Sequence, residues 1–252
     1  MRIEDLDSAR VVPGMAEEHL RTLAASGFEW DGAVLYQSQR REAHAAAIDT
    51  LRERGLVYEC SCSRRQLEAV GEEPAYPGTC RNGPTAPGPT ALRLRVDDAA
   101  VESWEDAWQG HCEYALGRLG DVVVRRRDGI HAYQLAVVVD DAAQGVTHVV
   151  RGADLLASTP WQRAIQRGLG LPLLEYAHLP LITEPSGQKL AKSRRSVPVD
   201  AGAAAVYDAL RLLRQEPPAA LARASLAEVW RWARAHWRPD RLRGVACVRA
   251  CP

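Results

Sequence analysis

The stretch Thr147-His-Val-Val-Arg151, followed by a helical pattern over Thr159–Leu169 and by Gly170, gives the clearest indication of fold class. Its short apolar run, bounded by polar residues, is typical of a buried strand. The second segment is predicted to be a helix that ends at Gly170, because glycine readily adopts the left-handed conformation found just after helices. A strand that leads into a helix is typical of α/β proteins.

The alternation of helices and strands continues on both sides of this stretch. Pro13 and Gly14 open a predicted helix that Gly27 closes, and a second helix over about 40–54 stops at Gly55. Further along, the patterns predict strands over 56–62 and 92–96, a hairpin around the Asp-Gly turn at 128–129, and helices beyond Pro198. The apolar run 135–139 fits either a strand or a helix.

The bulk composition narrows the class of protein. Lys plus Arg and Asp plus Glu number 32 each, so the net charge is zero, which argues against a general role in coating polyanions. The acidic N-terminal segment has no apolar core and does not resemble a signal peptide. No apolar run approaches the roughly 20 residues that cross a bilayer. We therefore expect a cytoplasmic protein, whose six cysteines are free thiols or metal ligands before disulfides.

Three of these cysteines form a pattern of their own. Cys60 and Cys62 are one residue apart, and Cys80 follows in a loop rich in glycine and proline. Thiolates are preferred zinc ligands, and an irregular segment with little apolar content is stabilised by such a metal. The pattern therefore predicts a structural zinc site. Spacing leaves the fourth ligand open among Tyr76, His111 and Cys112.

A second informative segment is Thr183-Glu-Pro-Ser-Gly-Gln-Lys-Leu-Ala-Lys-Ser193. A Pro-Ser-Gly turn presents Lys189 and Lys192, and more basic residues follow. Lysines on such a loop suit a polyphosphate, because their point charges can follow the negative charge that builds up as pyrophosphate leaves. A lysine-rich loop is more often a solvated surface, so this segment does not decide the function by itself.

Taken together, these segments resemble the glutamyl branch of the class I aminoacyl-tRNA synthetases. Lys189-Leu-Ala-Lys-Ser193 resembles the KMSKS loop of that family, and Arg2-Ile-Glu-Asp-Leu-Asp7 is similar to its glutamate-site strand. Further blocks occur in the order of the family: Trp30-Asp-Gly, Tyr36-Gln-Ser-Gln-Arg40, Arg127-Asp-Gly-Ile-His-Ala-Tyr-Gln-Leu-Ala-Val-Val-Val-Asp-Asp141, Gly145-Val-Thr-His-Val-Val-Arg-Gly-Ala-Asp154 and His178-Leu-Pro-Leu. The resemblance extends from residue 2 to about residue 195.

The resemblance implies an architecture for the whole chain. It implies a Rossmann-type catalytic domain with a parallel sheet over residues 1–200, interrupted by an insertion over about 56–118. The insertion would bear zinc on Cys60, Cys62, Tyr76 and Cys80. Residues 201–252 would form a C-terminal helical segment.

The resemblance also implies roles for individual residues. Glu4 and Tyr133 would hold the amino end of glutamate, and Arg151 would pair with one of its carboxylates. A carboxylate and a phenol suit an ammonium group, and a guanidinium suits a carboxylate. Lys189 and Lys192 would bind the phosphates of ATP, and Lys192 would also act in catalysis. The expected ligands are zinc and the substrates glutamate and ATP, with magnesium.

Two departures from the family pattern affect these expectations. The ATP-binding HIGH-type motif of the family lies before the Arg-Ile-Glu-Asp segment, and the sequence begins at that segment. We expect either a start site further upstream or a truncated remnant. The second departure is Ala191, where the family has serine, which is expected to weaken one phosphate contact.

The segment after Ser193 separates the branches of the family. Only 59 residues follow it, fewer than the roughly 100–150 of an anticodon-binding domain. The short form with this zinc pattern resembles the branch that transfers activated glutamate to queuosine at the wobble position of tRNA(Asp). We expect a monomer with glutamate, ATP and queuosine-containing tRNA(Asp) as partners and no membrane association. The alternatives are a non-catalytic, zinc-stabilised RNA-binding fragment and a piece of a true glutamyl-tRNA synthetase.

Overall fold

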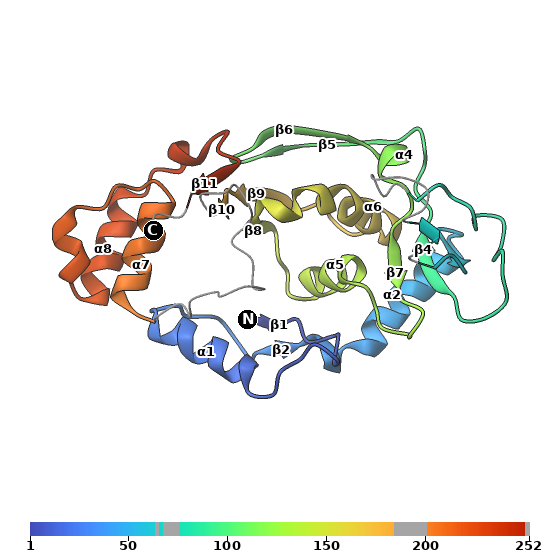
Figure 1. Ribbon diagram of the computed structural model, residues 1–252, viewed down its shortest axis with the longest axis horizontal. Helices are drawn as coiled ribbons and strands as arrows, with labels where there is room; N and C mark the ends of the chain where they lie inside the picture. Colours follow the sequence, from blue (N-terminus) through green and yellow to red (C-terminus); the bar gives the residue numbers. More distant parts are fainter. Residues whose placement is uncertain (64–65, 68–75, 184–200, 250–252) are drawn as a thin grey trace.

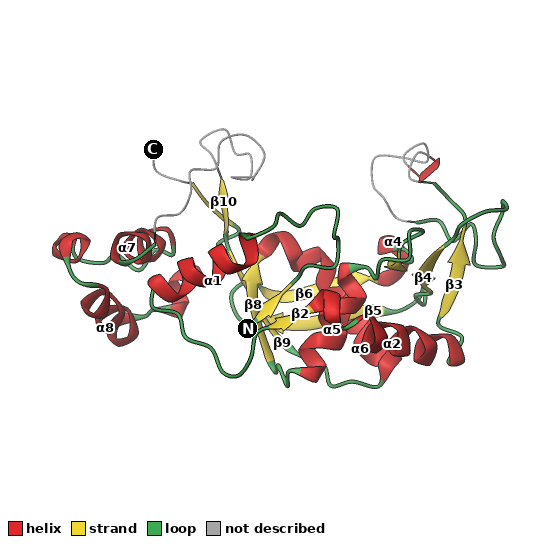
Figure 2. Ribbon diagram, turned by 90° about the horizontal axis from the view of Figure 1, so that it is seen from below, coloured by secondary structure: helices red, strands yellow, loops and turns green. Residues whose placement is uncertain are grey.

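The fold is α/β, as predicted, but its strands are divided among small sheets (Figure 2). A computed structural model describes residues 1–63, 66–67, 76–183 and 201–249. Within these residues there are two two-stranded sheets, β1 (Arg2–Ile3) with β2 (Leu35–Tyr36) and β10 (Leu181–Thr183) with β11 (Cys247–Arg249). A three-stranded sheet has the strand order β3 (Val57–Cys60), β4 (Ala91–Leu94), β7 (Val123–Arg125). A four-stranded sheet has the strand order β6 (Gly110–Ala115), β5 (Val101–Asp106), β9 (Glu175–Leu179), β8 (His148–Gly152).

The expectation of one parallel sheet needs correction. Parallel pairing occurs between β1 and β2, between β10 and β11 and between β8 and β9, while β3, β4 and β7 are antiparallel. The β5–β6 hairpin joins the parallel pair through one register contact, Asp106 with Tyr176. The sheet is therefore mixed, because a hairpin from the segment 56–118 extends it along the free side of β9.

The helices are α1 (Met15–Ala25), α2 (Arg41–Glu53), α4 (Leu116–Leu119), α5 (Tyr133–Ala143), α6 (Thr159–Leu169), α7 (Ala203–Leu212) and α8 (Leu226–His236), with short 3-10 turns at Gln37–Gln39, Ala153–Ser158, Ala219–Arg223 and Pro239–Leu242. The prediction for α6 agrees at both ends, and Gly170 after it is left-handed with φ 72°. None of the helices in the described part of the chain is long and apolar enough to span a membrane.

The main core lies between α2, α5 and α6. Leu51, Leu135 and Ile165, one from each helix, are fully buried. Burial of one such side chain stabilises the fold by about 1.5–3 kcal/mol. The run 135–139, which fitted either a strand or a helix, is the middle of α5. Residues on several sides of this helix are buried, so its apolar residues do not follow the helical period.

The hairpin predicted around Asp128-Gly129 is only partly correct. Gly129 has φ 84° and the turn forms, with the Arg126 amide donating to the Ile130 carbonyl. The returning arm is a single bridge between Arg125 and His131, after which α5 begins at Tyr133. The turn is therefore followed almost at once by Tyr133, the first residue of α5 and one of the predicted site residues.

The two ends of the elongated molecule are formed by different parts of the chain (Figure 1). Helices α7 and α8 lie at one end, and β3 and β4 lie at the other (Figure 2). Helix α8 begins with a capping box formed by Ser225 and Glu228. Trp230 of α8 donates from Nε1 to the Ser26 carbonyl at 2.8 Å, which attaches α8 to the end of α1.

Candidate active site and candidate metal site

Arg151, in β8, is held by side chains from two neighbouring elements. Its Nε donates to His178 Nε2 at 3.0 Å, Nη1 donates to Gln162 Oε1 at 2.7 Å, and Nη2 donates to Thr159 Oγ1 at 2.8 Å. His178 belongs to β9, and the other two belong to α6. These three contacts fix the plane of the guanidinium group. Arg151 is partly exposed, so the fixed cation lies at the surface of the sheet.

Tyr133 begins α5 and lies against Arg151. Burial raises the pKa of its hydroxyl, and the charge of Glu4 raises it further, while hydrogen bonds with Gln162 and Arg151 lower it. The phenol therefore stays protonated near neutral pH. The charges of both Glu4 and Arg151 act on this hydroxyl, so the three residues predicted from sequence to bind glutamate lie in the same part of the molecule.

Glu4 follows β1 and keeps its carboxylate 40% exposed. Its Oε1 accepts from Arg2 Nη2 at 3.1 Å and Nε at 3.3 Å. In the same region, Arg2 Nη1 donates to Asp141 Oδ1 at 2.6 Å. The contacts of Arg2 use Oε1, so Oε2 of Glu4 remains for a further donor such as an ammonium group.

Sequence reasoning did not assign a role to Arg2 or Asp141, although both lie in quoted family blocks. Burial raises the pKa of Asp141, whereas the charges of Arg2 and Arg151 lower it. The site therefore contains two guanidinium groups and two carboxylates, in addition to the phenol. The signal that could have identified Asp141 is the acidic pair at the end of an apolar helix, because buried acids need cationic partners.

A buried pair behind Arg151 was also missed. His178 Nδ1 lies 2.5 Å from Asp106 Oδ2, and neither side chain is exposed. Burial lowers the pKa of His178. The sequence block His178-Leu-Pro-Leu pointed to the histidine, but Asp106 comes from β5, far away in sequence. Lys189 and Lys192, the predicted phosphate-binding residues, lie outside the described residues.

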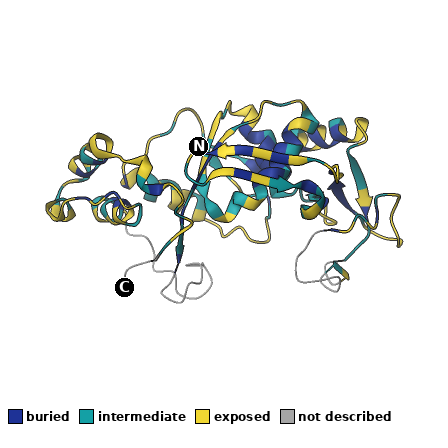
Figure 3. Cartoon of the chain, turned by 90° about the horizontal axis from the view of Figure 1, so that it is seen from above, coloured by how far each residue is buried: buried dark blue, intermediate teal, exposed yellow. Residues whose placement is uncertain are grey.

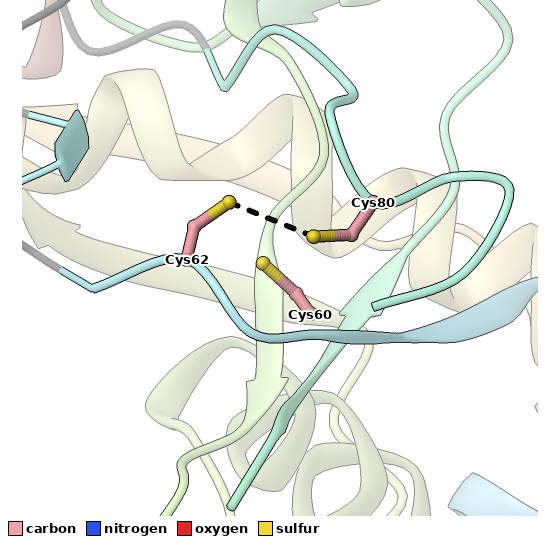
Figure 4. A group of neighbouring side chains, drawn as sticks. All are labelled: Cys60, Cys62 and Cys80. Carbon is pink, nitrogen blue, oxygen red and sulfur yellow. Dashed lines mark hydrogen bonds between the residues drawn. The ribbon is translucent and has the colours of Figure 1, made fainter. Parts of the chain in front are cut away.

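Cys60, Cys62 and Cys80 converge at the end of β3 (Figure 4). Their sulfur atoms all lie within 4.8 Å of one another, and Cys62 and Cys80 are 3.6 Å apart. A tetrahedral zinc site with Zn–S distances of about 2.3 Å requires sulfur separations of roughly 3.8 Å. The three thiols therefore have the spacing that a tetrahedral metal site needs.

Tyr76 is the fourth candidate ligand that joins this cluster. Its hydroxyl lies 3.3 Å from Cys60 Sγ and 3.7 Å from Cys62 Sγ. The other two candidates lie elsewhere: Cys112 packs with Trp104 and Tyr176, and His111 pairs with Glu105 on an exposed strand. Among the three candidates, Tyr76 is the one whose side chain lies next to the thiols.

Cys80 has the acidity that a metal ligand needs, whereas burial raises the pKa of Cys62. Burial raises the pKa of Cys80, but hydrogen bonds from Tyr76, Ser61 and Thr85 outweigh this and bring the pKa to about 5. Cys80 is therefore a thiolate at neutral pH, the form that binds metals. The Arg93 guanidinium lies 3.8 Å from the centre of the Tyr76 ring, so a cation also faces the phenol.

Comparison with known proteins defines the class. The sequence matches the family described as tRNA synthetases class I (E and Q), catalytic domain, over residues 1–216. The chain belongs to this family, in agreement with the resemblance noted in the sequence. Among solved structures, a glutamate tRNA ligase from Elizabethkingia meningosepticum, in complex with its amino acid, superposes with a TM-score of 0.75 at 22% identity. That likeness covers 98% of this chain and 59% of the ligase, and it shows the shared fold.

Two curated relatives are more similar in sequence to this chain than that ligase is. A glutamyl-Q tRNA(Asp) synthetase of Dechloromonas aromatica is 52% identical over 250 residues, which covers 95% of this chain and 83% of the relative. A protein of the same name from Pseudomonas aeruginosa is 51% identical over 245 residues, covering 96% of this chain and 83% of the relative.

Proposed function

We propose that this protein activates glutamate with ATP and transfers it to queuosine at the wobble position of tRNA(Asp). The proposal is supported by membership of the class I family and by relatives with this name at about half identity over nearly the whole chain. The observation that supports it is that the charges of Glu4, which follows β1, and of Arg151, in β8, both act on the hydroxyl of Tyr133 at the start of α5. tRNA is a cytoplasmic substrate, and we assign the reaction to the cytoplasm.

In the proposed complex, Glu4 and Tyr133 bind the ammonium group of glutamate. The free oxygen of Glu4 and the hydroxyl of Tyr133 accept its N–H groups. Arg151 binds one of the two carboxylates, because a guanidinium group makes charge-assisted hydrogen bonds with carboxylate oxygens. This arrangement orients the amino acid by both ends, so that its α-carboxylate is directed towards ATP.

The first chemical step forms glutamyl-adenylate. An oxygen of the α-carboxylate of glutamate attacks the α-phosphorus of ATP, and the bond to the bridging oxygen of pyrophosphate breaks. Magnesium, when bound with ATP, neutralises part of the charge on the phosphates. Lys192, assisted by Lys189, stabilises the departing pyrophosphate.

The sequence contains a second sign that these lysines are required. Lys189 and Lys192 are the only lysines in the chain, and every other strongly basic side chain is arginine. Lysine is retained in the segment that needs a compact ammonium group on a flexible stem, which arginine cannot replace.

In the second step a hydroxyl of the cyclopentenediol of queuosine attacks the carbonyl carbon of the adenylate. A new ester bond forms, the bond to the phosphate oxygen breaks, and AMP leaves. We propose no covalent intermediate with the enzyme, because the adenylate is already activated.

We also propose one structural zinc ion on Cys60, Cys62, Tyr76 and Cys80. The fit is supported by the sulfur separations, the nearby Tyr76 hydroxyl and the acidity of Cys80. Metal analysis of purified protein should find about one zinc per chain. A correctly folded protein with no bound metal would contradict this assignment.

Two assays test the catalytic proposal. The protein should catalyse ATP–pyrophosphate exchange that depends on glutamate and not on tRNA, and it should transfer radiolabelled glutamate to queuosine-containing tRNA(Asp). Tyr133→Phe should raise the KM for glutamate by about 10- to 100-fold, because a hydrogen bond to a charged group contributes about 1.5–3 kcal/mol. Tyr207→Phe, in α7, is the matched control and should leave the KM unchanged.

Lysine variants test the phosphate role. Lys192→Ala should slow exchange by about 100-fold or more, since loss of such a charge-stabilising group costs about 2.7–4 kcal/mol. Lys192→Arg should also be impaired if the ammonium group is required. An unchanged exchange rate in Lys192→Ala would show that the phosphate assignment is wrong.

A further inference from the structure

We propose that Asp106 and His178 are positioning residues that fix the orientation of Arg151 for substrate binding. This inference rests on the proposed function, because it concerns the residue assigned to the glutamate carboxylate. Asp106 is the last residue of β5 and His178 lies in β9, so the hairpin from the segment 56–118 contributes directly to the site. The three side chains form a chain of contacts from the interior to the surface.

Asp106 is the fixed end of this chain. Its Oδ1 accepts three backbone amides: those of Trp108 at 3.1 Å, Gln109 at 3.0 Å and His178 at 3.0 Å. Burial raises the pKa of this carboxyl group, but these hydrogen bonds and the one from His178 outweigh it, so that the pKa is lowered overall. Asp106 is therefore ionised, and its second oxygen, Oδ2, is the acceptor that faces His178 Nδ1.

The contacts of His178 determine its tautomer. The carboxylate of Asp106 can only accept, so Nδ1 of His178 carries the proton. On the other side of the ring, Arg151 Nε–H can only donate, so Nε2 must present its lone pair. Both neighbours thus require the same neutral imidazole, and the Thr159 hydroxyl, 3.3 Å from Nε2, is compatible with it because a hydroxyl can donate or accept. The lowered pKa of His178, caused first by its burial, agrees with this state.

The imidazole ring is itself prevented from turning. It stacks on Tyr176 at 5.9 Å between ring centres, with an angle of 12° between the planes. The guanidinium carbon of Arg151 lies 5.3 Å from the centre of the same Tyr176 ring. Tyr176 therefore supports the histidine and the arginine from one side, and the position of Arg151 Nε is determined by the position of His178 Nε2.

The register of the sheet explains why Asp106 can reach this position. Asp106 and Tyr176 are the register partners between β5 and β9, at the point where the hairpin meets the parallel pair. The neighbouring Glu105 faces solvent and pairs with His111 at 2.7 Å. Two neighbouring carboxylates of the same hairpin thus each pair with a histidine, Asp106 with the buried His178 of β9 and Glu105 with the exposed His111, and the exposed pair provides a matched control.

Asp106→Asn should reverse the tautomer. The Asn oxygen can still accept backbone amides, but its NH₂ group now donates to His178 Nδ1. The proton of the imidazole then moves to Nε2, where it faces Arg151 Nε–H, so two donors meet and Arg151 is displaced. We expect the KM for glutamate to rise about 10-fold or more, while the KM for ATP stays unchanged. Glu105→Gln should change neither.

His178 variants separate positioning from simple loss of packing. His178→Gln keeps an N–H group for Asp106 and an acceptor oxygen for Arg151, whereas His178→Leu keeps neither. We expect the KM for glutamate in His178→Gln to lie much closer to that of the unmodified protein than in His178→Leu. Equal effects of the two variants, or an Asp106→Asn protein that is folded and retains its KM for glutamate, would overturn the inference.

A measurement independent of activity distinguishes this inference from the proposed function. The chain has seven histidines, so nitrogen-15 labelling of histidine and two-bond proton–nitrogen correlation spectra can assign the tautomer of His178. We expect a proton on Nδ1 in the unmodified protein and on Nε2 in Asp106→Asn. Absence of glutamate-dependent exchange with the expected tautomers would reject the proposed function alone. The opposite tautomer in an active protein would reject the positioning role alone.

Discussion

Asp140 interacts with three side chains next to the candidate site. Its side chain is fully buried and accepts from Gln37 Nε2 at 2.8 Å and Arg40 Nε at 2.6 Å, with His44 Nε2 at 3.1 Å. These partners come from the 3-10 turn after β2 and from the start of α2. Asp140 therefore connects the N-terminal segment to α5, the helix that carries Tyr133.

Replacement of Asp140 should strongly destabilise the protein. Asp140→Ala leaves the buried groups of Gln37, Arg40 and His44 without their acceptor, and removal of one partner from a buried ionic network costs about 3–5 kcal/mol. Urea unfolding measures the change. The control is Asp49→Ala, whose exposed carboxylate pairs with Arg52 on α2 and which should change stability by about 0.5 kcal/mol or less. Equal effects of the two variants would contradict this role.

The acidity of Cys80 predicts a pH dependence in the metal-free protein. Its pKa is about 5 in the folded state and about 8.5 in the unfolded chain, so between these values the unfolded state binds one more proton. The contribution of Cys80 to stability should therefore be full above about pH 8.5 and should be lost as the pH falls towards 5. Urea unfolding in chelator across this range measures it.

The Cys80 prediction requires a comparison between variants, because other groups titrate in the same range. Cys80→Ala should lose the rise in stability with pH, while Cys247→Ala, an exposed thiol, should retain it. Parallel profiles for the unmodified protein and Cys80→Ala would show that the thiol is not acidic in the folded state.

Single-residue roles could be predicted from sequence only where a motif marks them. Glu4, Tyr133 and Arg151 lie in blocks that resemble the family, and the three do lie in the same part of the molecule, although their roles stay predictions. Asp106 could not be found in this way, because its partner His178 is 72 residues away and the contact depends on strand register. Spacing also left the choice between Tyr76, His111 and Cys112 open, and the folded chain brings only Tyr76 of these three next to the thiols.

At the level of elements, the contact between α1 and α8 depends on one glycine. Gly27 follows α1 with φ 81°, and a Cβ atom there would lie 2.8 Å from Trp230 Nε1. Gly27→Ala should destabilise the protein by about 1–2 kcal/mol or more, because it combines left-handed strain with a collision. Thermal unfolding measures this. Gly14→Ala, at φ 82° with no neighbour near the added Cβ, isolates the contribution of strain alone.

The elements that sequence predicted well are those with local signals, and the hairpin β5–β6 shows why others were missed. Glycines mark the ends of α1, α2 and α6, and these helices agree with the prediction within a few residues. Along β5, exposed and buried positions alternate (Figure 3), but the buried face carries Glu102, Trp104 and Asp106 while Val101 is 53% exposed. At Val101, Glu102 and Asp106, hydropathy therefore runs opposite to burial. Glu102 is stabilised by Arg163 and Arg167 of α6, a long-range contact that no local pattern reveals.

At the scale of the whole molecule, the cysteine cluster is separate from the main core. Cys60, Tyr76 and Cys80 form one group of buried residues, while α2, α5 and α6 enclose another. Removal of the proposed zinc should therefore affect the two regions differently. We expect chelator to increase amide hydrogen exchange around Cys60 and Cys80 and to leave the amides of α5 and α6 protected, as measured by mass spectrometry.

The chelation experiment has an internal control in the same sample. Addition of zinc after removal of the chelator should restore protection around the cysteines, while α5 remains unchanged throughout. A uniform rise in exchange over the whole chain would show that the metal supports the global fold instead of one region. No change anywhere would contradict a structural zinc.

The position of β8 at the end of its sheet affects how the chain behaves in concentrated solution. Among the described residues no strand pairs with the outer side of β8, and Val150 in this strand is 60% exposed. Unpaired amide and carbonyl groups beside an exposed β-branched side chain form a template for aggregation. The strand that holds Arg151 is thus also an edge that is open to self-association, and aggregation should increase with protein concentration.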